Sequence, residues 1–218
     1  MLTRMLPTPD NNPPPASNTK PFALTSLLQN GKLPLVLCAI ALLIQLGGNE
    51  ASQWLRYDRE GILNGEVWRI ISGHLVHLGW PHLFMNLVGL ILIWLLFGHL
   101  IKRSSWLITC IVSTLGISAG LMLFNPELRW YVGLSGLLHG MFVAGAIISV
   151  KAGFRAEILL LILLTAKLAW EQLVGPLPGS AEFAGGNVIV DAHLYGAIGG
   201  LIIALALIAY HSSRRPAA

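Results

Sequence analysis

A serine flanked by glycines, Ser135 in Gly133-Leu134-Ser135-Gly136, opens a long apolar run and is the candidate nucleophile of this sequence. Glycines leave a neighbouring hydroxyl unshielded, and the start of a helix offers free N–H groups and a positive dipole end where an oxyanion can form. The same residues also have a structural interpretation, because the spacing from Gly136 to Gly140 lets two helices touch. On its own, this string favours packing over catalysis.

A base for this serine is the next requirement, and His193 is the best candidate for it. Neutral imidazole can accept a proton at about pH 7 and return it to a leaving amine. Gly196 and Gly200 follow His193 at +3 and +7, on the same helical face. They would let two helices approach closely enough for a hydrogen bond between Ser135 and His193.

Composition predicts where this chemistry takes place. Of the 218 residues, 55% are hydrophobic and 11% are charged, and the mean hydropathy is +0.69, which is typical of an integral membrane protein. Cys38 and Cys110 lie in apolar runs, which favours packing over a disulfide. The net charge of +4 is not accompanied by a basic cluster interleaved with aromatics, so no nucleic-acid partner is predicted.

Six apolar segments predict an all-α, polytopic membrane protein with six transmembrane helices, because lipid-facing backbone must satisfy its own hydrogen bonds. The first span could begin nearer Phe22, and 47–81 reads as a structured interface loop rich in Trp and Tyr. We expect a disordered cytoplasmic tail over 1–20, a membrane domain over 21–212 and a cytoplasmic tail over 213–218. The expected spans are 33–46, 82–100, 106–124, 135–150, 157–173 and 188–210.

Charge predicts the orientation, with both termini in the cytoplasm. Asp10 and Glu157 are the only acids on the cytoplasmic side in this arrangement, so it obeys the positive-inside rule. Lys167 precedes Glu171 by one helical turn inside the fifth span, which indicates an ion pair. The basic residues on the cytoplasmic side are Arg4, Lys20, Lys32, Lys102, Arg103, Lys151, Arg155, Arg214 and Arg215.

With this orientation, the second, fourth and sixth spans all run from outside to inside, so residues early in each lie at similar depth. His82 and Asn86 begin the second span one turn apart on one face, and Ser135 begins the fourth. His193 lies about five residues, or roughly 7 Å, into the sixth. Ionisable residues inside a membrane are costly and indicate a functional site by default. The active site is therefore expected to open to the outer face.

Taken in order along the chain, these motifs resemble the rhomboid intramembrane serine protease family over the six-helix body. The resemblance implies a dyad of Ser135 and His193 without a third acid. It also implies an oxyanion site made from His82, Asn86 and the backbone N–H of Ser135, and a structural role for Trp68-Arg69. The residues that carry it are Trp68-Arg69, His77, His82, Asn86, Gly133-Leu134-Ser135-Gly136, Ala192-His193, Gly196 and Gly200.

One position departs from the broad family pattern. Many rhomboids carry a tyrosine four residues after the nucleophile, where this chain has His139. That residue, the compact length and the sequence Asp191-Ala192-His193-Leu194 resemble the rhombosortase branch. This branch is implied to cut surface proteins ahead of a C-terminal signal of Gly-Gly, an apolar helix and a basic tail. His139 could stack on His193 or hydrogen-bond to it, and we favour stacking support over a second base.

Other polar residues have simpler interpretations. His74 and His77 could join His82 as zinc ligands, but no His-Glu-x-x-His helix and no cysteine ligands accompany them, so neither a metal nor a cofactor is predicted. Asp191 sits two residues before His193 and should point from another helix face. It is expected to be a helix-start group or a substrate contact.

Two classes of function follow, with a third that is weaker. The first is a serine protease that cleaves membrane-anchored proteins with a C-terminal apolar helix, and its partners are those substrates and the lipid bilayer. The second is a non-catalytic rhomboid-like protein that binds a client in the polar cavity. Because Ser135, His193, His82 and Asn86 are all present, the sequence favours the enzyme. The third is a zinc-dependent membrane hydrolase.

Overall fold

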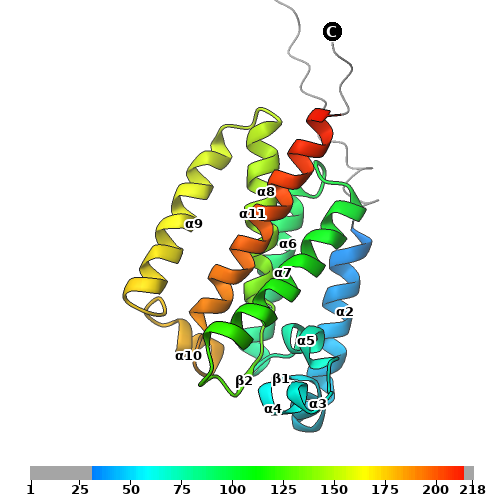
Figure 1. Cartoon of the computed structure of the whole chain (residues 1–218), viewed down its shortest axis with the longest axis vertical. Coiled ribbons are helices and arrows are strands. Elements are labelled where there is room, and N and C mark those ends of the chain that lie inside the picture. The colour runs from blue at the N-terminus through cyan, green and yellow to red at the C-terminus, as the bar shows by residue number, and fades with distance from the viewer. Residues whose placement is uncertain (1–30, 214–218) are drawn as a thin grey trace, which may run out of the picture.

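The computed structural model describes residues 31–213, and six long helices form its body (Figure 1). Each of their ends lies within three residues of the predicted span. Pro81 starts α6 earlier than expected, because proline is tolerated in the first turn of a helix. The predicted tail over 1–20, the predicted tail over 213–218 apart from Ser213, and a first span beginning near Phe22 lie outside the described residues. Ser213 is the last residue of the final helix. The six helices are α2 (Lys32–Leu46), α6 (Trp80–Phe97), α7 (Arg103–Phe124), α8 (Ser135–Lys151), α9 (Ala156–Leu173) and α11 (Val190–Ser213).

Three of these helices, α6, α7 and α11, are long and apolar enough to cross a membrane. A fourth span results if α2 and the adjoining α3 (Gly48–Leu55), bent by 118°, count as one. Two helices fall short for simple reasons: α8 has 17 residues, and α9 carries the charges of Glu157, Lys167 and Glu171. The protein is thus a mostly helical multi-pass membrane protein, and the count of six crossings stays a prediction.

The segment over 47–81 folds into short elements at one end of the bundle. It contains α3, β1 (Tyr57–Asp58), α4 (Arg59–Leu63), α5 (Arg69–Ser72) and the 3₁₀ turn η1 (Gly73–Leu75). Arg69 is buried there and donates to the backbone carbonyls of Gln53 and Arg56 at 2.8 and 3.0 Å, and it pairs with Glu66. These contacts agree with the structural role that the resemblance implied for Trp68-Arg69.

A two-residue strand pair connects this end region to the start of α8. Strand β1 lies antiparallel to β2 (Trp130–Tyr131), with Tyr57 opposite Tyr131. Both tyrosines are almost completely buried, at 0% and 2% exposure. The pairing therefore fixes the backbone that leads into Ser135. A further short helix, α10 (Ser180–Ala184), precedes α11.

Helices α8 and α11 pack with their backbones in direct contact, through the glycines that the sequence placed on one face. A Cβ atom built on Gly196 would lie 2.0 Å from the carbonyl oxygen of Gly136, and one on Gly200 would lie 2.0 Å from that of Gly140. No side chain fits at such distances, so only glycine allows this approach. The prediction that these glycines bring the fourth and sixth helices together is confirmed.

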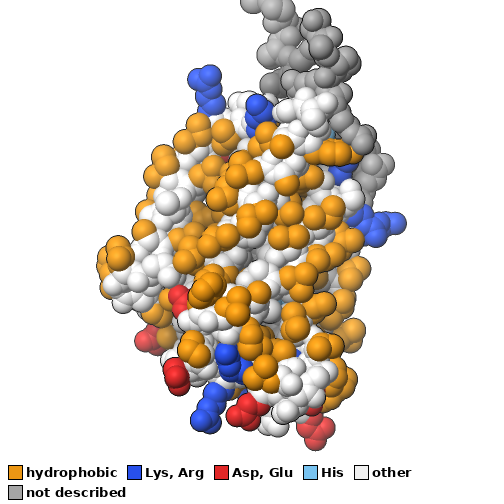
Figure 2. All heavy atoms as spheres, in the orientation of Figure 1, with side chains coloured by type: hydrophobic (Ala, Val, Ile, Leu, Met, Phe, Trp, Pro, Cys, Tyr) orange, Lys and Arg blue, Asp and Glu red, His pale blue; other side chains and the backbone are white. Residues whose placement is uncertain are grey.

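The surface of the bundle agrees with a membrane environment. Figure 2 shows hydrophobic side chains covering the middle of the face in view, with carboxylates gathered at the lower end. Large apolar side chains on α6, α7, α9 and α11 are exposed, among them Phe84, Ile111, Leu159 and Leu205. An apolar face of this extent would be unfavourable in water and is normal against lipid.

Candidate active site

Ser135 is the first residue of α8, as predicted, and a constrained loop presents it. Gly133 adopts a φ of +133°, which L side chains rarely adopt. Its carbonyl accepts a 2.7 Å hydrogen bond from the Tyr131 hydroxyl, and its N–H donates to the Gly73 carbonyl at 3.2 Å. Because α8 starts at Ser135, its first N–H groups have no partner within the helix and point into the loop region.

His193 lies against this serine. Its Nε2 atom is 3.0 Å from the Ser135 hydroxyl oxygen, and the side chain is only 5% exposed. Helix α11 begins at Val190, so His193 sits in its first turn and not five residues inside. The helix starts later than predicted, but the two side chains still meet because the glycine face holds α8 and α11 together.

His82 and Asn86 lie one turn apart on α6, and both are buried. A Cβ atom on Gly133 would lie 3.3 Å from His82 Nε2 and 3.8 Å from the Ser135 hydroxyl oxygen, so this imidazole edge borders the nucleophile. The Leu78 N–H donates to His82 Nδ1 at 3.4 Å, which places the ring proton on Nε2. Asn86 Nδ2 is buried with no hydrogen-bond partner. His82 thus presents an N–H donor beside the nucleophile, and the buried Asn86 amide one helical turn away keeps an unpaired donor.

His139 stacks on His193, with ring centroids 4.2 Å apart and ring planes inclined by 16°. Its Nδ1 atom lies 2.7 Å from the Ser135 carbonyl oxygen. Since a carbonyl only accepts, Nδ1 carries the proton and Nε2 is left as an acceptor. The stacking arrangement is the one favoured from the sequence.

Glu171 is the residue that the sequence analysis missed. The predicted ion pair with Lys167 is confirmed, at 2.8 Å from Nζ to Oε2. However, the carboxylate oxygens also lie 3.1 and 3.0 Å from His193 Nδ1. The resemblance implied a dyad without a third acid, whereas the structure places this carboxylate beside His193. The sequence feature that could have indicated it is the charged pair of Lys167 and Glu171, one turn apart in a mostly apolar helix. An ion pair between the two residues was taken as a full explanation of both charges.

Asp191 contributes elsewhere. It lies in the first turn of α11, where its Oδ2 accepts from Asn125 Nδ2 at 2.5 Å. Asn125 Oδ1 in turn accepts from the Tyr195 hydroxyl at 3.0 Å. This carboxylate thus joins α11 to the end of α7, in agreement with a helix-start group.

The histidines before α6 do not assemble into a ligand set in the part of the chain that the structure describes. His74 Nε2 lies 3.0 Å from the Ser118 hydroxyl, which itself donates to the Ile70 carbonyl at 2.7 Å. Burial lowers the pKa of His74 to about 4. His77 packs edge-on against His82, with ring centroids 5.0 Å apart. Both rings are therefore neutral parts of the packing.

One group in the described residues does have metal-like spacing, since ligand atoms of His139, Glu171 and His193 lie within 4.8 Å of one another. The Lys167 ammonium already lies among them, 2.7 Å from His139 Nε2 and 2.8 Å from Glu171 Oε2. An internal cation thus fills the space that a metal ion would need.

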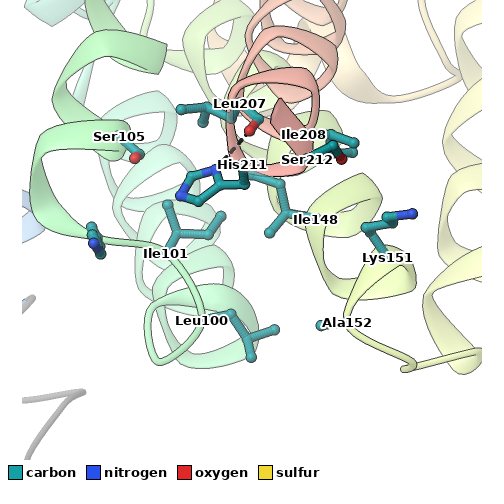
Figure 3. A pocket seen from close by; sticks show the side chains of 11 residues that line it. Leu100, Ile101, Ser105, Ile148, Lys151, Ala152, Leu207, Ile208, His211 and Ser212 are labelled. Atoms are coloured by element: carbon teal, nitrogen blue, oxygen red, sulfur yellow. Dashed lines mark hydrogen bonds between the residues drawn. The ribbon is translucent and has the colours of Figure 1, made fainter. Parts of the chain in front are cut away.

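Two of the pockets lined by residues of α8 lie at different distances from Ser135. A groove of about 250 Å³ between α6, α8 and α9 is almost entirely apolar and reaches His139; its lining is Gly89, Leu92, Ile93, Leu96, Leu138, His139, Phe142 and Leu164. Another pocket, of about 310 Å³, includes Lys151 and His211 in its lining (Figure 3). Because Ser135 begins α8 and Lys151 ends it, this second pocket lies roughly 24 Å along the helix from the nucleophile. Of these two pockets, the first is the one that lies beside the site.

The sequence is similar to a known protein family and to two individual proteins. The sequence matches the family described as Rhomboid domain over residues 64–210. It is 30% identical over 175 residues to the rhomboid protease GlpG of Yersinia enterocolitica serotype O:8 / biotype 1B, covering 78% of this chain and 59% of GlpG. It is 27% identical over 149 residues to YdcA of Bacillus subtilis (strain 168), whose name assigns it provisionally to the rhomboid proteases. That match covers 66% of this chain and 68% of YdcA.

Proposed function

This chain belongs to the rhomboid family, and we propose that it is an intramembrane serine endopeptidase in which Ser135 is the nucleophile and His193 the general base. The observation that carries the proposal is the 3.0 Å contact between the Ser135 hydroxyl and His193 Nε2. That distance is within hydrogen-bond reach for proton transfer from a serine to an imidazole.

The reaction follows from the placement of these groups. The Ser135 oxygen attacks the scissile carbonyl carbon while its proton passes to His193 Nε2. The carbonyl oxygen gains the negative charge and accepts hydrogen bonds from His82 Nε2, Asn86 Nδ2 and the N–H groups at the start of α8. When the C–N bond breaks, the imidazolium returns the proton to the leaving amine and an acyl-enzyme remains on Ser135. Water or another acceptor then releases the acyl group.

A membrane helix is the substrate that fits this surface. The groove between α6 and α9 is almost entirely apolar, and it leads to His139, which stacks on the proposed base. Figure 1 places α9 at the edge of the bundle, beside α8 and α11. An apolar helix could lie in the groove from the lipid side, and we propose that the C-terminal anchors of exported proteins bind in this way.

We further propose the specificity of the rhombosortase branch. A stable helix hides its backbone, so a scissile carbonyl becomes available only where the substrate unwinds. Glycine lowers the cost of unwinding by about 1 kcal/mol per residue relative to alanine. Ser135 starts its helix at the end of the bundle that we assign to the outer face of a bacterial inner membrane. A Gly-Gly pair at the outer start of an anchor is therefore the favoured cleavage point.

Cleavage assays with purified protein in lipid vesicles test this proposal. A client ending in Gly-Gly, an apolar helix and a basic tail should be cut at or next to the glycines, as read by mass spectrometry of the released C-terminus. Replacing the two glycines with leucine should abolish processing. Equal processing of the leucine client would refute the Gly-Gly specificity, and cleavage by Ser135→Ala would refute the serine mechanism.

A further inference from the structure

We infer that Glu171 is a positioning residue for the proposed reaction, which fixes the tautomer of His193 and stabilises its protonated form. The inference rests on the proposed serine protease activity and extends it. Both oxygens of the carboxylate lie close to His193 Nδ1, at 3.1 and 3.0 Å. The opposite ring nitrogen, Nε2, is the one that contacts Ser135. The three side chains thus form a line from acid to imidazole to hydroxyl.

Hydrogen-bond chemistry determines where the imidazole proton resides. Two groups lie near Nδ1, the Glu171 carboxylate at 3.0 Å and the Lys167 ammonium at 3.2 Å. The ammonium already donates to two closer acceptors, Glu171 Oε2 at 2.8 Å and His139 Nε2 at 2.7 Å. Because an ionised carboxylate only accepts, we assign the Nδ1 proton to the bond with Glu171. The neutral ring then has its lone pair on Nε2, directed at the Ser135 hydroxyl. The opposite tautomer would place a proton on Nε2 and leave no acceptor for the serine. When His193 takes up the serine proton, the adjacent carboxylate offsets the new positive charge.

Lys167 explains how an acid can stay ionised here. Glu171 is only 3% exposed, and a buried carboxylate is costly unless it is paired. The Lys167 ammonium, 25% exposed, provides this partner at 2.8 Å. An ammonium only donates, and its bond to Oε2 leaves the second oxygen, Oε1, at 3.1 Å from Nδ1 and free to accept from His193.

His139 completes the same network. Its Nδ1–H donates to the Ser135 carbonyl at 2.7 Å, and its Nε2 accepts from Lys167 Nζ at 2.7 Å. Every proton in the set then has one consistent position, and α8, α9 and α11 are joined through it. A surface ion pair that merely stabilised α9 would need neither the contact to His193 nor the contact to His139. The network therefore indicates a function for the charges of α9 at the site.

Glu171→Gln is the decisive substitution, because it keeps the shape and removes the charge. The Lys167 ammonium can only donate, so it selects the amide oxygen and turns the amide NH₂ toward His193. Nδ1 must then accept, which moves the ring proton to Nε2 and blocks the base. We expect kcat to fall by about a hundredfold to ten-thousandfold, with KM changed by less than about twofold. Glu171→Asp, which keeps the carboxylate, should recover a large part of kcat.

Glu157→Gln is a matched control on the same helix. Glu157 Oε1 accepts from the Ser149 hydroxyl at 3.1 Å, near the other end of α8. The same change of acid to amide there should leave kcat and KM at the wild-type values. If removing any carboxylate from α9 were enough to impair the enzyme, kcat would fall to the same extent in Glu157→Gln and in Glu171→Gln.

The tautomer itself can be measured by ¹⁵N NMR of histidine-labelled protein, with the His193 signals assigned by their loss in His193→Ala. We expect the proton on Nδ1 in the wild type and on Nε2 in Glu171→Gln. The inference is overturned if the wild-type ring carries its proton on Nε2, a result that does not depend on how Glu171→Gln folds. It is also overturned if Ser135-dependent cleavage proceeds in Glu171→Gln with wild-type kcat. Cleavage that persists in Ser135→Ala would instead refute the proposed function.

Discussion

Replacing Gly196 with alanine is a direct test of how the backbone of two helices positions the site. The added Cβ would lie 2.0 Å from the Gly136 carbonyl oxygen, whereas real Cβ atoms essentially never approach closer than 3.0 Å. Helix α11 must therefore move away from α8 by about 1 Å. His193 lies one turn earlier on the same helix, 3.0 Å from Ser135. The displacement takes this contact to about 4 Å, beyond hydrogen-bond reach.

The expected loss of activity is larger than the loss of stability. A misplacement of about 1 Å at a catalytic contact costs on the order of a hundredfold in rate. Overpacking destabilises by about 1–3 kcal/mol, and alanine returns about 1 kcal/mol of helix propensity. Thermal unfolding in detergent and cleavage of an anchor substrate measure the two effects separately. We expect a folded protein with a modestly lower Tm and kcat reduced about a hundredfold.

Gly116→Ala is the control for this experiment. It makes the same substitution within a long helix, but the nearest atom to the new Cβ is the Tyr195 carbonyl oxygen, at an ordinary 3.9 Å. This variant should keep its activity, and its Tm should equal or exceed that of the wild type, because alanine favours a helix by about 1 kcal/mol over glycine. Wild-type kcat in Gly196→Ala would refute the reasoning, because it would mean that the close approach of α8 and α11 does not set the distance from Ser135 to His193.

Three further predictions follow from the same geometry. His82→Ala and Asn86→Ala should each lower kcat by about tenfold to a thousandfold while Ser135 stays reactive toward a fluorophosphonate, because each removes one oxyanion donor; a change confined to KM would indicate a role in substrate binding. Gly89→Leu should fill the apolar groove and lower kcat/KM for a helical substrate without slowing the fluorophosphonate, and equal cleavage would exclude the groove as the binding site. Burial lowers the pKa of His74 from its ordinary value of 6.5 to about 4, so the unfolded chain binds the proton more readily than the folded protein. Tm should therefore fall as pH decreases from about 6.5 to 4. If Tm depends on pH in His74→Gln as steeply as in the wild type, this assignment is contradicted.

The long helices could be predicted from the sequence because their cause is local. Runs of apolar residues force helical hydrogen bonding in lipid, and the boundaries follow from residues such as Pro81 and Ser135. The contact between α8 and α11 was also accessible, because Gly196 and Gly200 repeat at helical spacing. Periodicity and small residues thus suffice for the part of the fold that brings Ser135 and His193 together.

The remainder depends on contacts between distant segments. The short elements of 47–81 are joined to the start of α8 by the pairing of Tyr57 with Tyr131. These residues are far apart in the sequence, so no local pattern predicts that they pair. Glu171 has a complete local explanation in its pair with Lys167, so the sequence gives no reason to look for a third contact. Only the position of α9 beside α11 shows that the carboxylate also faces His193. Helix packing, not residue type, determined which acid joins the site.

The central claim is that Ser135 is a nucleophile activated by His193, and covalent labelling tests it most directly. Purified protein in lipid is treated with a fluorophosphonate, and the adduct is located by mass spectrometry of its peptides. We predict one adduct per chain, on Ser135, which forms more slowly by orders of magnitude in His193→Ala and is competed by an anchor substrate. An adduct on any other residue, or none in a preparation that cleaves its substrate, would contradict the account.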